Sequence, residues 1–192
     1  MSAELFFNKI RTYYNISEQS ELAWRNLLQE RKYKKGDYFI ASGQIPRKVA
    51  FVVKGLFSQY YITEKGDTVI KYFFPEGRIA GSIPATLTQT ESYFAIEAIE
   101  NTTVLEYDFS EFKKLVSTLK DVAEFYIRYI EQHWIIDKEP YEISLRSDSS
   151  RVRYDEFLSK YPELVKRLKK QHIAAFLGIT PTQLSRIFFA NK

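Results

Sequence analysis

Apolar and polar residues alternate in short runs through the middle of the chain, from about residue 32 to residue 109. Val, Ile, Phe, Tyr and Thr dominate these runs, as is typical of β-strands. The runs are Tyr38–Ala41, Val49–Val53, Phe57–Ile62, Thr68–Phe74, Tyr93–Ala98 and Val104–Phe109. Glycines separate them at near-regular intervals, and Lys65-Gly66-Asp67 has the composition of a hairpin turn. The pattern therefore predicts a small antiparallel β-roll or barrel.

Helical patterns flank this region on both sides. The N-terminal stretch to about Glu30 predicts a helix, with Ser17 as an N-cap before Glu18 and Glu21. After the strands, apolar residues recur in steps of three and four, which predicts a long helix over about residues 111–139. One stripe of this helix consists of Leu119, Val122, Tyr126, Tyr129, His133 and Ile136.

A second stripe beside the first contains Ala123, Ile127, Ile130 and Trp134. A helix with two apolar flanks needs two partners, which favours packing on the protein's own roll and on the same helix of a second subunit. Burial of the helix within one monomer is the alternative. Pro140 lacks an amide proton, so we expect the helix to stop or kink near Glu139.

The polar run from Arg146 to Ser150 is typical of a connector, and we place a domain boundary there. The division is into residues 1–145, an effector domain that includes the long helix, and residues 146–192. In the second part, Tyr154, Phe157, Leu158 and Tyr161 follow the spacing of a helix with one buried face, ended by Pro162. The chain as a whole is expected to be an α+β protein.

The segment from Lys170 to Ile187 has the pattern of two short helices that cross steeply. Ala174 supplies a small residue at the approach, and Gly178 supplies the turn. Thr180 and Gln183 form a capping box around Pro181 at the first helical position. The inward positions are Ile173, Leu177, Ile179, Leu184 and Ile187.

As a helix-turn-helix, this unit would present Pro181, Thr182, Ser185 and Arg186 to the major groove of double-stranded DNA. Arg186 is the candidate for reading guanine through a bidentate contact, and Pro181 and Thr182 suit a thymine methyl group. Contacts to phosphates are expected from Lys169, Lys170, Thr180 and Gln183. An ordinary helical hairpin with a capping box is the alternative.

The charge distribution points in the same direction. The chain has a net charge of +4, but residues 146–192 hold ten Lys and Arg against four Asp and Glu, a net +6. The remaining residues hold 18 against 20, a net −2. A basic tail on a near-neutral body is typical of binding to a polyanion, although solvated surfaces are often basic too.

Composition narrows the classes of function. Cysteine is absent, which excludes disulfides, thiolate metal sites and a cysteine nucleophile. Two histidines, His133 and His172, are too few for the metal centre of a cupin-like enzyme, so no enzyme, metal or cofactor is expected. The chain shows neither a signal peptide nor an apolar run long enough to span a membrane, and we expect a cytoplasmic protein without a membrane partner.

The order of roll, long helix and helix-turn-helix resembles the Crp/Fnr family of bacterial transcription regulators over nearly the whole chain. Lys35–Gly43 and Phe51–Gly55 resemble the opening of the family's cyclic-nucleotide-binding roll, and Ile173–Arg186 resembles its DNA-reading unit. The resemblance implies a winged-helix-like C-terminal domain and a homodimer joined through the long helix. It also implies a two-fold-related operator, a small-molecule effector and, for an activator, contact with RNA polymerase.

The sequence departs from the family at the nucleotide pocket. The family's ribose-binding glutamate and phosphate-binding arginine are replaced, in Gly81-Ser82-Ile83 and in Ser92-Tyr93, by serines. Because charge-assisted bonds to phosphate are about twice as strong as neutral ones, we expect cyclic AMP not to be the effector. Arg78 is either a substitute ligand or a solvated loop residue. The pocket is expected either to take another ligand, apolar or aromatic, or to be filled by side chains. For the protein as a whole, the alternative function is an interaction module without specific DNA binding.

Overall fold

The computed structural model describes residues 1–189, with only the backbone of Phe189. Two antiparallel four-stranded sheets form the centre, and the predicted roll is confirmed. In one sheet the order is β1 (Gln29–Tyr33), β8 (Thr102–Asp108), β3 (Lys48–Lys54) and β6 (Ile79–Ala80). In the other it is β2 (Tyr38–Ile40), β7 (Ala95–Ala98), β4 (Phe57–Ile62) and β5 (Thr68–Phe74). Both ends of β4 and β5 lie where the sequence pattern predicts them.

The turns use glycine where the backbone requires it. Gly66 has φ of +84° between β4 and β5, and the Asp67 carbonyl accepts from the Thr63 amide at 2.9 Å, so the predicted hairpin is confirmed. Gly55 has φ of +104°, and a Cβ atom there would lie 2.5 Å from the Thr102 Oγ1 atom. The apolar side chains between the two sheets are buried, among them Ile40, Val52, Phe57, Ile96 and Val104.

The prediction of one helix up to Glu30 is wrong. The structure has α1 (Ser2–Arg11), α2 (Glu18–Arg25) and then strand β1. Ser17 does cap α2, since its Oγ accepts from the Ser20 amide at 3.2 Å. The missed strand carries four exposed residues, Gln, Glu, Arg and Lys, because it is an edge strand paired only with β8, and so it lacks an apolar alternation.

The long helix also differs from its prediction. Helix α4 (Phe109–Thr118) ends before Leu119, which is extended, and α5 (Lys120–Ile130) begins after it. The Asp121 carboxylate fixes this break, because it accepts hydrogen bonds from the Ser17 amide at 2.7 Å and from the Ser20 hydroxyl at 2.7 Å. These bonds join the start of α5 to α2, a contact that the periodicity of the segment does not contain.

Beyond α5 the rod continues as a π-helix, η1 (Glu131–Ile136), and then as α6 (Lys138–Ser147). Pro140 lies in the first turn of α6, where its missing amide proton leaves no hydrogen bond unmade. Helical structure therefore passes Pro140 and ends at Ser147, with a turn at Asp137 between η1 and α6. Of the two outcomes expected near Glu139, an end of the helix is wrong, and a kink stays a prediction. The expected domain boundary after residue 145 falls within the last turn of α6.

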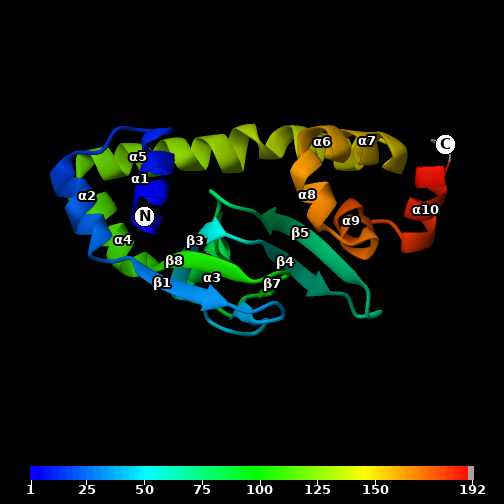
Figure 1. The fold of residues 1–192 in the computed structure, drawn as a ribbon, viewed down its shortest axis with the longest axis horizontal. Helices are drawn as coiled ribbons and strands as arrows, with labels where there is room; N and C mark the ends of the chain where they lie inside the picture. Colours follow the sequence, from blue (N-terminus) through cyan, green and yellow to red (C-terminus); the bar gives the residue numbers. More distant parts are fainter. Residues whose placement is uncertain (190–192) are drawn as a thin grey trace.

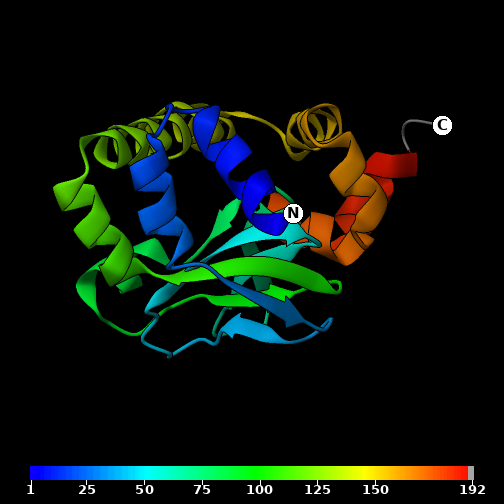
Figure 2. The same ribbon diagram turned by 60° about the vertical axis from the view of Figure 1, so that its left-hand side comes forward.

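Four helices complete the described chain, namely α7 (Ser150–Lys160), α8 (Pro162–Arg167), α9 (Lys170–Leu177) and α10 (Pro181–Phe189). They lie at one end of the molecule, and α1, α2 and α4 lie at the other, with the rod of α5, η1 and α6 running between them along the roll (Figure 1; Figure 2). Between Ser150 and Phe189 the described residues form helices without a strand, so the winged part of the predicted domain remains a prediction. A short helix, α3 (Ile83–Thr88), follows β6 within the roll.

Two further apolar clusters attach these helices to the roll. The N-terminal core, as we call it, joins α1, α2, α4 and α5 to β3 and β8 through Phe6, Phe7, Trp24, Phe51, Tyr107, Phe112 and Phe125. The C-terminal contact joins the last helices to β5, where the ring centroids of Phe73 and Phe176 lie 5.4 Å apart. Both ends of the molecule are thus anchored on the same roll.

Candidate functional site

Helices α9 and α10 are joined by a sharp turn. Gly178 ends α9 with φ of +67°, a left-handed conformation that favours glycine. The Ile179 amide donates to the Ala174 carbonyl oxygen at 3.1 Å, which satisfies the end of the helix. The turn glycine lies where the sequence pattern predicts it.

The start of α10 is fixed by a capping box. The Thr180 amide donates to the Gln183 Oε1 atom at 2.8 Å, and the Gln183 amide donates to the Thr180 Oγ1 atom at 3.1 Å. The two side chains therefore satisfy two amides that the first turn of a helix leaves unpaired. Their direct role is to hold the helix start; their predicted contact with phosphates stays a prediction.

The two faces of this helix pair are distinct. Ile173, Ala174, Leu177 and Leu184 are buried, and Ile179 and Ile187 are half-buried. On the outer face of α10 the predicted groove residues Pro181, Thr182 and Arg186 are exposed, and Ser185 is half-buried. Helix α10 lies at the outer end of the molecule (Figure 1). Arg186 is thus directed away from the protein core.

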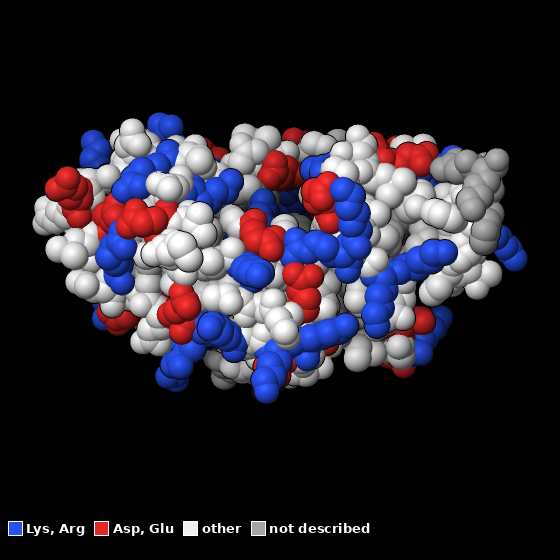
Figure 3. All heavy atoms as spheres, viewed as in Figure 1, with Lys and Arg blue, Asp and Glu red and all other residues white. Residues whose placement is uncertain are grey.

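Many basic residues of the C-terminal part are already engaged. Arg167 forms ion pairs with Glu76 at 2.8 Å and with Glu100 at 2.5 Å, and Arg153 donates to the backbone carbonyls of Asp148 and Leu177. On the face drawn in Figure 3, basic and acidic side chains are interspersed over the roll.

Three of the basic residues next to the turn have no acidic partner. Lys169, Lys170 and Arg186 are exposed and form no ion pair within the described residues, although the Lys170 Nζ atom lies 4.8 Å above the ring of Phe188. Lys192, which the sequence count includes in the basic excess, lies outside the described residues. Arg146 on α6 and Lys160 on α7 are likewise exposed without an ion pair among the described residues. Cations at the start of α9 and on α10 are therefore among those available to a polyanion.

The two segments that correspond to the family's nucleotide cassette are hydrogen-bonded to each other. Ser82 and Ser92 are both buried, and their hydroxyl oxygens lie 2.8 Å apart. The Ser92 hydroxyl also lies 2.7 Å from the Phe94 carbonyl oxygen. The structure thus brings together the two segments that the sequence analysis paired, but both polar side chains are satisfied within the protein and neither is charged.

A small cavity of about 160 Å³ lies beside this turn, lined in part by Gly81, Ile83 and Tyr93. Lys71 also lines it, a residue that the sequence analysis missed because it stands among the alternating residues of a strand. Burial lowers the pKa of Lys71, and its Nζ atom lies 4.6 Å above the ring of Phe94. The cavity is therefore narrow and walled by rings on one side.

Arg78 does not face this turn. Its Nη1 atom lies 2.9 Å from the Nδ1 atom of His133 on η1. The His133 Nδ1 atom also lies 2.7 Å from a carboxylate oxygen of Asp137, and the His133 Nε2 atom lies 2.7 Å from the Tyr13 hydroxyl. Burial, and then the charge of Arg78, lower the pKa of His133, against the opposing effect of Asp137. Arg78 is therefore not a freely solvated residue, and its role as a substitute ligand stays a prediction.

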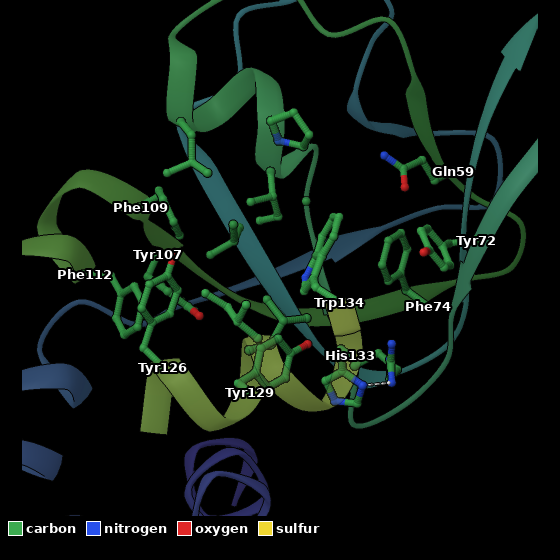
Figure 4. A pocket seen from close by; sticks show the side chains of 18 of the residues that line it. Gln59, Tyr72, Phe74, Tyr107, Phe109, Phe112, Tyr126, Tyr129, His133 and Trp134 are labelled. Atoms are coloured by element: carbon green, nitrogen blue, oxygen red, sulfur yellow. Dashed lines mark hydrogen bonds between the residues drawn. The ribbon is translucent and has the colours of Figure 1, made fainter. Parts of the chain in front are cut away.

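A larger cavity of about 410 Å³ lies between the roll and the long helix. Aromatic rings line most of it, from Phe109, Phe112 and Tyr126 at one end to Tyr72 and Phe74 at the other (Figure 4). Burial raises the pKa of Tyr129 in its wall to about 12. Arg78, Gly81 and Ile83, three of the residues that the sequence analysis assigns to the effector pocket, line this cavity. Its aromatic walls could not be predicted from sequence, because they come from strands, α4, α5 and η1.

The stripe predicted for dimerisation faces the protein's own roll. Val122 is fully buried in the N-terminal core, Leu119, Tyr126 and Tyr129 pack against that core, and His133 bonds to Arg78. Ile136 is the member of the six-residue stripe that is exposed, with Ile127, Ile135 and Ile143 exposed along the same rod. Five of the six residues thus contact the protein's own chain, and dimerisation through this helix stays a prediction.

The described residues contain no group of three or more His, Asp or Glu side chains placed to hold a metal ion. Within the same part of the chain, no helix combines the length and the apolar character needed to cross a bilayer.

Comparison with known proteins bears on the roll first. Residues 30–118 match the model of the cyclic nucleotide-binding domain family, a span that runs from β1 to the end of α4. A search of curated protein sequences finds no match.

Solved structures resemble the chain over a longer span. FixK2 from Bradyrhizobium japonicum has 19% identity and a TM-score of 0.71, with 85% of this chain and 83% of that chain covered. The regulator CLP of Xanthomonas campestris has 12% identity and a TM-score of 0.73, with 91% of each chain covered. The catabolite activator protein of Thermus thermophilus has 20% identity and a TM-score of 0.56, with 93% and 84% covered. The chain therefore shares the fold of Crp/Fnr-type regulators.

Proposed function

We propose that this protein is a DNA-binding transcription regulator of the Crp/Fnr type that acts as a homodimer on a two-fold-related operator. The observation that carries the proposal is the α9–α10 pair, whose glycine turn and capping box aim an exposed Arg186 away from the core. Shared fold alone would not support DNA binding, because one fold serves many functions.

In this proposal α10 enters the major groove as the recognition helix. Arg186 reads a guanine, Pro181 and Thr182 contact thymine methyl groups, and Ser185 contacts a base edge. Lys169 and Lys170, at the start of α9, bind phosphates together with Thr180 and Gln183, and so position the helix without reading sequence.

Dimerisation is proposed along the rod of α5, η1 and α6. Ile127, Ile136 and Ile143 are each about half exposed or more, which is a large apolar surface for a helix without a covering partner. Two copies joined there would place two recognition helices about one helical turn of DNA apart. RNA polymerase is the further partner if the regulator activates.

The effector is proposed to be a small molecule other than cyclic AMP. Ser82 and Ser92 bond to each other at the position of the family's charged ligands, so neither the family's glutamate nor its arginine is there to hold a cyclic nucleotide. Lys71 lines the small cavity beside the turn, but burial lowers its pKa and so disfavours its charged form. CLP, described as a c-di-GMP responsive regulator, supports the idea that this fold serves more than one effector.

Electrophoretic shift tests the proposal. A pool of random duplexes, selected on the protein, should yield a palindromic site whose affinity falls steeply with salt. Arg186→Ala should weaken that site about 5- to 150-fold and relax one base position, since a bidentate contact contributes about 1–3 kcal/mol. The double change Lys169→Ala and Lys170→Ala should reduce the salt slope by about 2.

Lys166→Ala is the matched control, because Lys166 pairs with Glu163 on α8 at 2.6 Å and should leave binding unchanged. Failure to select any duplex, with the protein folded and dimeric, would favour the interaction module that no longer binds DNA specifically.

A further inference from the structure

The 410 Å³ cavity between the roll and the long helix has the size of a ligand site. Pockets that hold drug-sized molecules have volumes of about 300–1,000 Å³. It adjoins the cassette turn, because Gly81 and Ile83 line both this cavity and the smaller one, whereas Ser82 lines only the smaller one. Trp134 stands between the two ends of the cavity (Figure 4).

Two polar side chains lie among the apolar walls. Gln59 on β4 is 4% exposed and Tyr107 on β8 is 3% exposed, and both line the cavity. Figure 4 shows the Gln59 amide directed toward the rings of the cavity. Buried polar side chains are nearly always paired, so an occupant with a complementary group would gain a hydrogen bond here.

The charges of the lining residues limit the chemical class of the occupant. No Asp or Glu lines the cavity, and in its one Lys or Arg side chain, Arg78, the Nη1 atom lies 2.9 Å from the Nδ1 atom of His133. A charged group placed among Phe109, Phe112 and Tyr126 would lose its hydration without gaining a counter-ion. Flat aromatic walls favour stacked or edge contacts with another ring.

We propose that this cavity binds an uncharged, ring-bearing small molecule, about the size of two fused rings, with one hydroxyl, carbonyl or amide group that pairs with Gln59. The binding itself does not depend on DNA recognition. Its role as the effector rests on the function proposed above: α5 and η1 form one wall, and the same rod continues through α6 to the C-terminal helices.

Calorimetric titration of the full chain with four compounds tests the proposal. 2-Naphthol should bind, with naphthalene about three- to tenfold weaker because it lacks the hydrogen-bonding group. 2-Naphthoate and cyclic AMP should bind at least ten times more weakly than 2-naphthol, as a charge among apolar walls requires. Ligand-observed NMR gives the same ranking where solubility limits calorimetry.

Two variants locate the site. Gln59→Leu keeps the volume and should abolish the preference for 2-naphthol over naphthalene. Ile83→Trp should fill the cavity and remove binding of both compounds, whereas Leu22→Trp, on the exposed face of α2, should leave both unchanged. If Ile83→Trp fails to fold, Gln59→Leu still decides the matter.

Several results would overturn the inference. They are no binding of 2-naphthol up to its solubility limit, equal binding of 2-naphthol and naphthalene to the unaltered protein, or a preference for 2-naphthoate that Arg78→Gln removes. Selection of a DNA site alongside any of these would leave the proposed function intact. If the ligands bind as expected but no DNA site is selected, the proposed regulatory function would be wrong and the proposed ligand site would stand.

Discussion

On its N-terminal side the roll meets α1, α2 and α5 through fully buried rings, whereas on its C-terminal side it meets α8 and α9 through half-exposed ion pairs and a few rings. Phe6 and Trp24 are 0% exposed, with ring centroids 5.1 Å apart. Arg167 reaches Glu76 and Glu100 with side chains that are 28% to 42% exposed. The first contact is part of the folding core, and the second has the character of an interface that opens without unfolding the roll.

Truncating one ring on each side is the strongest test of this difference. Phe6→Ala should lower the free energy of unfolding by about 3–5 kcal/mol, because it leaves a cavity in a fully buried cluster. Phe176→Ala, at the half-buried C-terminal contact, should cost about 1–2 kcal/mol. Urea unfolding followed by circular dichroism measures both. Similar losses for the two variants would mean that the C-terminal contact is as much a part of the core as the other.

Removing the ion pairs should loosen the C-terminal contact alone. Arg167→Gln should cost about 1 kcal/mol or less in unfolding free energy, since partly exposed pairs contribute little, but it should increase proteolytic cleavage at the Asp148–Ser149 link. Lys166→Gln is the matched control, because its pair with Glu163 is more exposed and joins no two parts of the molecule. Added salt should reproduce the effect of Arg167→Gln in the unaltered protein.

The same contact gives the smallest effect, a dependence on pH. Burial alone would raise the pKa of Glu76, but hydrogen bonds from Arg167 and from the Gly55 amide outweigh it, so its pKa lies below the ordinary 4.5. Its contribution to stability is therefore present above pH 4.5 and is lost as the pH falls through the folded-state pKa. Unfolding free energies at pH 7 and pH 3.5 should differ less for Arg167→Gln than for the unaltered protein. Equal differences would contradict the role of this pair.

What the sequence could predict follows from how local each feature is. The capping box of Thr180 and Gln183 and the turn at Gly178 depend on neighbours within a few residues, and both are present where predicted. Strands β4 and β5 follow from alternation around one hairpin. By contrast, the break at Leu119 depends on the bond between Asp121 and Ser17, which are distant in sequence.

The candidate sites divide in the same way. The residues proposed for DNA contact belong to one continuous segment, so their exposure could be anticipated from a helical pattern. The large cavity combines Gln59, Tyr107 and Trp134 from three separate elements, and periodicity within each element reads them as ordinary core positions. Periodicity also leaves open which side of the long helix meets the roll, because both of its stripes are apolar and only the tertiary structure distinguishes them.

The π-helical turn Glu131–Ile136 changes what the rod can do along its length. A widened turn takes up one residue more than an α-helical turn does, and one residue corresponds to about 100° of rotation about the axis. The side chains of α6 are consequently rotated about the axis relative to those of α5. The face of the rod that meets the roll therefore differs from the face that meets α7–α10. If this turn became regular α-helix, α6 and the helices α7–α10 that follow it would rotate about the axis of the rod.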